Sequence, residues 1–194
     1  MPHDAYADDD IRAILTGVKS IAMVGASPVN VRPSYFVFKY LAQRGYDMIP
    51  VNPVHVGKKL LGKPFVGSLS DIEQPVDMID IFRNASHIQP VVEAALSMRP
   101  LPKVIWMQLG ARNDEAAALA EAKGLKVVMN RCPKIEYGRL SSEISWMGVN
   151  SRTLSSKRAP IPTTGMQLSL NRTSTSGGET GASDRAAKNK NDPA

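Results

Sequence analysis

A short run of small residues, Gly25-Ala26-Ser27, separates the apolar segment 21–24 from an apolar helical pattern that begins near Ser34. Gly25 can adopt backbone angles that are closed to other residues, and Ala26 and Ser27 leave room for a ligand beside the main chain. The first turn of the helix then offers unpaired N–H groups to an anion. This order of residues predicts a loop that binds the phosphates of a nucleotide-like ligand.

The loop after segment 48–51 differs from that of an NAD site. An NAD site carries Asp or Glu at this point to bind the ribose hydroxyls, whereas this chain has Asn52-Pro53. The first loop is not G-x-G-x-x-G either. Four basic side chains follow the second strand instead: His55, Lys58, Lys59 and Lys63. Cations there favour an adenosine with an extra ribose phosphate, as in coenzyme A (CoA) or NADP, and the alternative interpretation is a solvated loop.

Residues typical of catalytic or metal sites are few and scattered. His3, His55 and His87 are far apart, and no Ser-His-Asp or Cys-His order is present, so we predict neither a catalytic residue nor a metal site. Asp80 lies in the middle of a predicted strand, where it either faces a polar partner or marks a strand face against a loop. Cys132 has basic neighbours, which favour a reactive thiolate able to form a mixed disulfide with CoA; the alternative is a small, half-buried residue that closes a strand.

Regular elements alternate along the first part of the chain. Apolar strands are predicted at 21–24, 48–51, 78–82, 104–107 and 125–129. Helices are predicted at 8–17, from 34 to a stop at Gly45, after a capping box at Ser86–Gln89, and from the cap Asn113 to Gly124. Strands that alternate with helices predict an α/β fold, a single domain with a doubly wound parallel sheet. Pro50 inside the second strand indicates an edge strand or an irregular one.

Ligands of such sheets bind beyond the carboxyl ends of the strands. Those ends are Gly25-Ala26-Ser27, Asn52-Pro53, Phe82-Arg83, Gln108-Leu109-Gly110 and Asn130-Arg131-Cys132. We expect Arg32 and Arg83 to contact phosphates and Gln108 to turn its amide toward a ligand. Trp106 and Met107, just before Gln108, are expected in the core.

Five longer motifs contain all of these positions except Phe82 and Arg83: Ile21-Ala22-Met23-Val24-Gly25-Ala26-Ser27, Arg32-Pro33-Ser34, Ile49-Pro50-Val51-Asn52-Pro53, Trp106-Met107-Gln108-Leu109-Gly110, and Asn130-Arg131-Cys132-Pro133-Lys134-Ile135-Glu136-Tyr137. Together they resemble the small CoA-binding proteins, which are free-standing Rossmann-like domains similar to the N-terminal domain of the succinyl-CoA synthetase α subunit. The resemblance covers roughly residues 8–158.

The resemblance implies that CoA lies across the strand ends. The loop 25–27 would hold the pyrophosphate, the Asn52-Pro53 loop the adenosine end, and the ends of the third and fourth strands the pantetheine arm. The ligase domain has a lysine soon after its second strand, and His55, Lys58 and Lys59 are the nearest matches here. The candidate cofactor-binding residues are Gly25, Ala26, Ser27, Arg32, Pro33, Ser34, Asn52, Pro53, His55, Lys58, Arg83, Gln108 and Gly110.

The ligase carries its phosphorylated histidine in a second domain that has no counterpart in this sequence. We therefore expect a protein that binds CoA or an acyl-CoA without intrinsic catalysis. An NADP-linked reductase or an acyl-CoA-processing enzyme is the alternative, and a third interpretation is a subunit that completes an acyl-CoA ligase with a partner chain. A homo-oligomer also stays open.

Composition bounds the remaining classes. The chain has 194 residues and a formal charge of +6, but Lys and Arg exceed Asp and Glu only by 17 to 15 in residues 1–150, against 7 to 3 in 151–194. No basic stripe interleaved with aromatic residues is present, so nucleic-acid binding is not predicted. The sequence has neither an apolar leader nor a long apolar stretch, so we do not expect it to associate with a membrane. Its single cysteine fits a reducing compartment, and we expect a cytoplasmic protein. Residues 159–194 are small and polar and are predicted to form a disordered tail.

Overall fold

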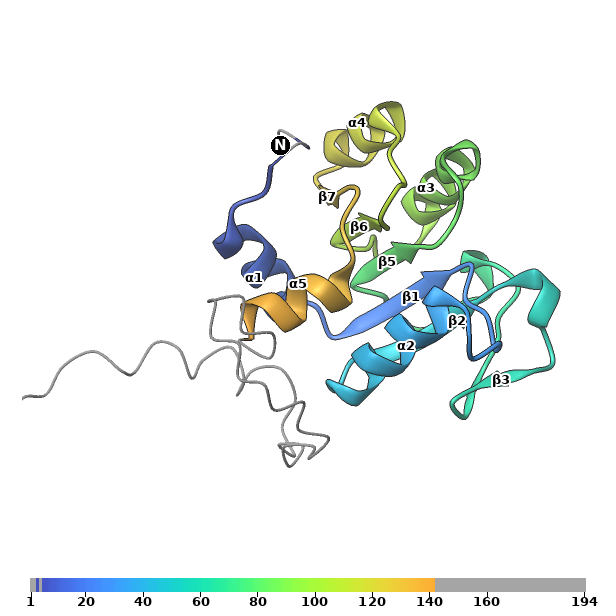
Figure 1. Cartoon of the computed structure of the whole chain (residues 1–194). Coiled ribbons are helices and arrows are strands. Elements are labelled where there is room, and N and C mark those ends of the chain that lie inside the picture. Colours follow the sequence, from blue (N-terminus) through green and yellow to red (C-terminus); the bar gives the residue numbers. More distant parts are fainter. Residues whose placement is uncertain (1–2, 4, 142–194) are drawn as a thin grey trace, which may run out of the picture.

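The computed structural model describes residue 3 and residues 5–141, which form a five-stranded parallel sheet with helices on both faces (Figure 1). The strands are β1 Ser20–Val24, β2 Asp47–Val51, β5 Met78–Ile81, β6 Val104–Met107 and β7 Lys126–Val128. The helices are α1 Asp8–Gly17, α2 Pro33–Gln43, α3 Ile88–Ser97, α4 Asp114–Ala122 and α5 Pro133–Leu140. A small hairpin, β3 Lys59–Leu60 with β4 Lys63–Pro64, and three 3-10 turns, η1 Pro53–His55, η2 Leu69–Asp71 and η3 Ala85–His87, complete the elements.

The strand order β2-β1-β5-β6-β7 confirms the predicted doubly wound sheet. The chain runs outward from β1 to β2 and then returns to the other side of β1 to form β5. The order therefore reverses between β1 and β5, whose registered pairs run from Ile21 with Met78 to Val24 with Ile81. A crevice at such a reversal is the usual ligand site of this architecture.

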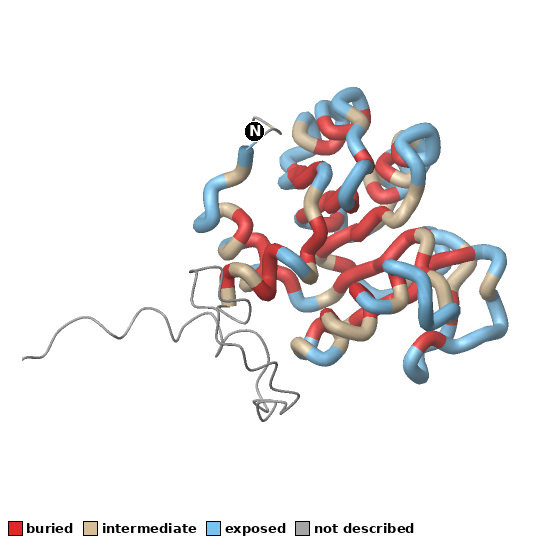
Figure 2. Tube along the Cα trace, viewed as in Figure 1, coloured by how far each residue is buried: buried red, intermediate tan, exposed pale blue. Residues whose placement is uncertain are grey.

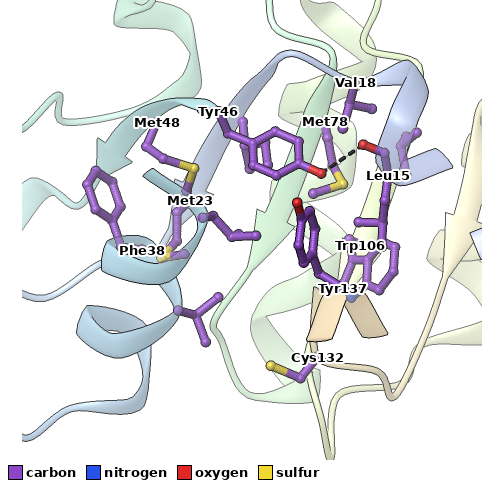
Figure 3. Packing of buried hydrophobic residues seen from close by; sticks show 14 of the residues in the cluster. Leu15, Val18, Met23, Phe38, Tyr46, Met48, Met78, Trp106, Cys132 and Tyr137 are labelled. Carbon is purple, nitrogen blue, oxygen red and sulfur yellow. Dashed lines mark hydrogen bonds between the residues drawn. The ribbon is translucent and has the colours of Figure 1, made fainter. Parts of the chain in front are cut away.

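Helices α1, α2 and α5 cover one face of the sheet, and α3 and α4 cover the other (Figure 1). Buried residues follow the strands and the inward helix faces, while exposed residues gather in the loops (Figure 2). On the first face, Met23, Phe38, Trp106 and Tyr137 are among the fully buried side chains, and the Tyr46 hydroxyl donates to the Leu15 carbonyl over 2.7 Å (Figure 3). Each large apolar side chain of this kind contributes about 1.5–3 kcal/mol by leaving water.

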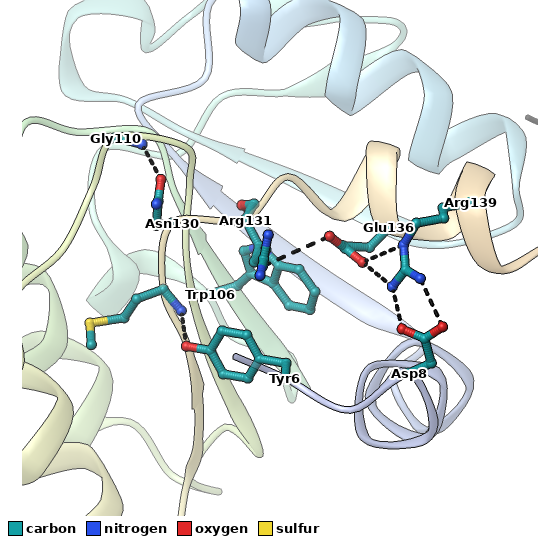
Figure 4. Close-up of polar contacts among 9 residues, drawn as sticks. Tyr6, Asp8, Trp106, Gly110, Asn130, Arg131, Glu136 and Arg139 are labelled. Atoms are coloured by element: carbon teal, nitrogen blue, oxygen red, sulfur yellow. Dashed lines mark hydrogen bonds and ion pairs between the residues drawn. The ribbon is translucent and has the colours of Figure 1, made fainter. Parts of the chain in front are cut away.

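An ion-pair network joins the two ends of the described chain. Arg139 in α5 donates to Asp8 at the start of α1 over 2.8 Å and to Glu136 over 2.7 Å (Figure 4). Arg131 lies 4.0 Å from Glu136, and its carbonyl accepts from the Trp106 indole over 2.8 Å. The Arg139–Asp8 pair thus links α5 to α1, and the Arg131 carbonyl links the segment before α5 to β6.

Several sequence predictions are confirmed. Pro50 lies in an edge strand, where its missing N–H does not interrupt the sheet. Asn113 caps α4 by accepting from the Ala116 N–H over 2.9 Å, and Trp106 and Met107 are fully buried.

The predicted capping box at Ser86–Gln89 is wrong. The turn η3 occupies its position, so α3 begins at Ile88 without a side-chain cap. Ser86 hydrogen-bonds to its neighbour His87 instead, and Gln89 donates to Glu93 on the next turn. Helix α5 and the hairpin β3–β4 were not predicted. The boundary at 158 and the predicted tail 159–194 lie outside the described residues.

Candidate ligand-binding site

The loop after β1 lies directly against the end of β5. Gly25 has a φ of +87°, and a Cβ at this position would overlap the Phe82 carbonyl oxygen. The same added atom would lie 3.3 Å from the Arg83 Nε, so the Gly25 loop and Arg83 are neighbours across the reversal of strand order. Glycine is therefore required by the close approach of two strand ends, and a larger residue would disturb the sheet as well as any ligand beside it.

Asn52 joins the loops after β1 and β2. Its Nδ2 donates to the Ala26 carbonyl over 2.8 Å, and its Oδ1 accepts from the Val54 N–H over 3.2 Å. The side chain is buried and both of its polar atoms are engaged. Asn52 thus fixes the conformation of the loop after β1, and the Ser27 hydroxyl in that loop accepts from the Val29 N–H over 3.2 Å.

A cavity of about 440 Å³ opens beyond the ends of β5 and β6. It is bounded by the start of α2, the segment after β5, the loop after β6 and the start of α5; its lining residues are Pro33, Val37, Phe82, Arg83, Asn84, Gln108, Leu109, Gly110, Ala111 and Cys132. Arg83 makes no hydrogen bond or ion pair with any other described residue. A half-buried, unpaired guanidinium beside a helix start provides a positive site for a phosphate.

Gln108 in the cavity wall forms a buried polar pair with Asp80 behind it. The Gln108 Nε2 donates to the Asp80 Oδ1 over 2.9 Å, and Asp80 is fully buried in β5 between Met23 and Trp106. The other carboxyl oxygen, Oδ2, is buried without a hydrogen-bond partner among the described residues. Burial raises the pKa of Asp80 to about 7, against the smaller opposing effect of the Gln108 hydrogen bond. Of the two alternatives that the sequence left open for Asp80, the structure shows the polar partner.

Cys132 lines the cavity at the start of α5, with 7% of its surface exposed. Burial raises its thiol pKa although the Ile135 and Lys134 backbone N–H groups work in the opposite direction, and the nearby Asp80 adds to the rise. The group is therefore a protonated thiol at neutral pH, which supports the interpretation of Cys132 as a small packing residue.

The loops after β6 and β7 are joined by Asn130, which has a φ of +53°. Its Oδ1 accepts from the Gly110 N–H over 2.8 Å (Figure 4). This contact positions the loop beside Gln108. The prediction of site residues did not include Asn130, although an Asn directly after a strand tolerates the left-handed conformation and marks such a turn.

The basic residues after β2 separate into two groups. Lys58 and Lys59 are exposed, and His55 stacks edgewise on Phe65 with ring centroids 5.3 Å apart. Lys63 instead forms an ion pair with Asp47 over 2.7 Å at the beginning of β2. Of the four basic residues that the sequence places after the second strand, Lys63 is therefore paired with Asp47, whereas Lys58 and Lys59 are exposed.

Four of the predicted binding residues line the cavity: Pro33, Arg83, Gln108 and Gly110. The others are not among its lining residues. Gly25, Ala26 and Ser27 form the adjoining loop, Arg32 is the exposed N-cap of α2 next to the buried Ser34, and Asn52, Pro53, His55 and Lys58 follow β2. Val37, Asn84 and Ala111 line the cavity without having been predicted to do so.

A second cavity of about 520 Å³ lies along the outer side of β2. Its lining includes Asp47, Asp71 and Glu73, and its one lysine, Lys63, is paired with Asp47. This acidic lining disfavours a phosphorylated ligand, so the cavity at β5 and β6 is the better candidate.

Neither a metal cluster nor a membrane span is found in the part of the chain that the structure describes. Within it, no three His, Cys, Asp or Glu side chains gather as metal ligands would. No helix of that part combines the length and apolar character needed to cross a bilayer.

Comparisons with known proteins agree with this geometry. The chain is 36% identical over 128 residues to the Bacillus subtilis (strain 168) protein YneT, across 66% of this chain and 92% of the relative. A hypothetical protein from Pyrococcus horikoshii OT3 superposes with a TM-score of 0.66 at 40% identity, covering 72% of this chain and 96% of that one. A structure from Thermus thermophilus superposes with a TM-score of 0.65 at 36% identity, covering 69% of this chain and 98% of that one. The family model described as "CoA binding domain" matches residues 19–138, and the chain therefore belongs to that family.

Proposed function

We propose that this protein binds CoA or an acyl-CoA in the crevice between β1 and β5, without intrinsic catalysis. The observation that carries the proposal is the unpaired Arg83, which lies in the cavity wall beside the Gly25 loop at the reversal of strand order. The CoA-binding family model, which spans both strands, supports the same ligand.

The three parts of CoA meet different surroundings along this path. Arg83 and the start of α2 suit the pyrophosphate, because both present positive charge or N–H groups. The exposed Lys58 and Lys59 suit the ribose 3′-phosphate beyond Asn52. The cavity lined by Val37, Gln108 and Cys132 suits the pantetheine arm, which is part apolar and part amide.

Binding without catalysis is favoured by the chemistry of the cavity wall. Cys132 in this wall has a thiol pKa raised by burial, and Asp80 lies behind Gln108 and does not line the cavity. A thiol held protonated is a poor nucleophile, and Asp80 is already engaged with Gln108. Association with a ligase partner chain or with a second copy stays a prediction, which size-exclusion chromatography with and without CoA would test.

Calorimetric titration with CoA, acetyl-CoA, NADP and NAD tests the proposal. We expect CoA and acetyl-CoA to bind and NAD not to bind. Arg83→Met should weaken CoA about tenfold or more, since a charge-assisted contact is lost. Arg99→Met is the matched control, because Arg99 caps the far end of α3 through the Leu96 and Met98 carbonyls. Tighter binding of NADP than of CoA, or equal CoA affinity in both variants, would contradict the proposal.

A further inference from the structure

One polar atom of the Gln108 amide is hydrogen-bonded within the described part of the protein, and the other is left without such a bond there. Its Nε2 donates to Asp80, and among the described residues its Oε1 accepts no hydrogen bond. Gln108 lines the cavity while Asp80 lies behind it, fully buried in β5. The hydrogen bond to Asp80 thus determines which end of the amide is left for a ligand.

We propose that Asp80 is a positioning residue that holds the Gln108 amide with its Oε1 toward the ligand, so that the cavity selects a group with an N–H donor. The Asp80 Oδ1 accepts a hydrogen bond whether or not the carboxyl carries a proton on Oδ2, because Oδ1 keeps its lone pairs in both forms. In both of these forms the amide nitrogen of Gln108 lies on the Asp80 side, as the structure has it, and its carbonyl oxygen is left for the cavity.

This inference rests on the proposed function and names the part of the ligand that the pair reads. The pantetheine arm of CoA contains two secondary amides, each with an N–H donor. The nucleotide end of CoA is instead recognised through its own phosphates. A cavity that presents an acceptor amid apolar side chains such as Val37 and Leu109 fits an amide of that arm. A ligand amide that offered only its carbonyl oxygen would face another oxygen and bind less well.

The test is a double-mutant cycle with two ligands, CoA and adenosine 3′,5′-bisphosphate, which lacks the pantetheine arm. Gln108→Met removes the oxygen that would accept from the ligand. Asp80→Leu removes the hydrogen bond that holds the Gln108 amide in its orientation. Each single variant should weaken CoA about tenfold, the effect of one lost hydrogen bond, and should leave the bisphosphate affinity unchanged. The double variant should be no weaker than Gln108→Met, because Asp80 acts through Gln108.

Asp80→Asn is the matched control, since its Oδ1 still accepts from the Gln108 Nε2, and we expect CoA affinity within about twofold of wild type. Asp80→Ala replaces Asp80→Leu if the latter does not fold. Additive losses in the double variant, or equal losses for both ligands, would overturn the positioning role. Failure of the wild type to bind either ligand would instead overturn the proposed function, so the two failures are distinguishable.

Discussion

Replacing Asp80 by asparagine should change how the stability of the fold depends on pH. Asp80 is fully buried, and its pKa rises from the ordinary value of 3.8 to about 7. Because the folded protein holds this proton more tightly than the unfolded chain, the contribution of Asp80 to stability is fully present below the unfolded pKa. It is lost as the pH rises through the folded pKa. Asparagine has no proton to lose, so the variant should lack this loss.

The magnitude follows from the two pKa values. Each unit of difference between the folded and unfolded pKa changes the free energy of unfolding by about 1.4 kcal/mol. The free energy of unfolding therefore falls by about 4 kcal/mol in total once Asp80 is ionised in both the folded and the unfolded state. About 3 kcal/mol of this should appear between about pH 5 and pH 9, because at pH 5 the unfolded chain is already ionised. For a domain of this size that is a relative difference in Tm of about 6–12 °C.

The assay is urea unfolding of wild type and Asp80→Asn at both pH values, with CoA absent. At each pH the free energy of unfolding of the variant is subtracted from that of wild type, and the two differences are then compared. The amide that the substitution introduces imposes the same penalty at both pH values, so this penalty cancels. Asp77→Asn supplies a control that should show no such change, because both pH values lie above the range in which Asp77 takes up its proton. Despite the opposing effect of its burial, the pKa of Asp77 is lowered, because Lys103 and the Lys19 and Ser20 N–H groups donate to it. Its contribution is therefore present above the unfolded pKa and lost in acid. If Asp80→Asn differed from wild type by the same amount at both pH values, the reasoning about the buried Asp80 carboxyl would be refuted.

Three further predictions concern the loops and the tail. Lys58→Ala with Lys59→Ala should remove a preference for CoA over dephospho-CoA worth about 1–3 kcal/mol, while Lys63→Ala, whose lysine pairs with Asp47, should retain it in parallel titrations. Asn52→Ala should lower the free energy of unfolding by about 1–3 kcal/mol, because the Ala26 carbonyl loses a buried donor; an unchanged denaturation midpoint would argue against this. Truncation after Arg158 should alter neither the Tm nor the CoA affinity, since the removed segment is small and polar, and a drop of several degrees would show that it packs.

Much of the fold is predictable from local patterns. Alternation of apolar strands and helices predicts the parallel sheet, Pro50 its edge, and Asn113 the start of α4. Helix α5 escaped prediction because its eight residues, Pro133–Leu140, mix apolar and charged side chains and carry a glycine. The capping box at Ser86 failed because a 3-10 turn, in which the His87 N–H donates to the Asn84 carbonyl over 2.9 Å, occupies the same segment.

The candidate site divides along the same line. Residues that follow strands, such as Gly25, Arg83 and Gln108, are marked as ligand-facing by position alone, since parallel strands end at one edge of the sheet. Which of their polar atoms stay available depends on partners far along the chain. Asn52 donates a hydrogen bond to the Ala26 carbonyl, and Lys63 forms an ion pair with Asp47. The Gln108 amide nitrogen donates to Asp80. The residue types and the sheet edge that they follow can be predicted from local sequence, because each lies directly after an apolar strand. Which of them remain unpaired depends on the folded structure, because a hydrogen bond between distant residues requires a particular strand order and particular buried neighbours.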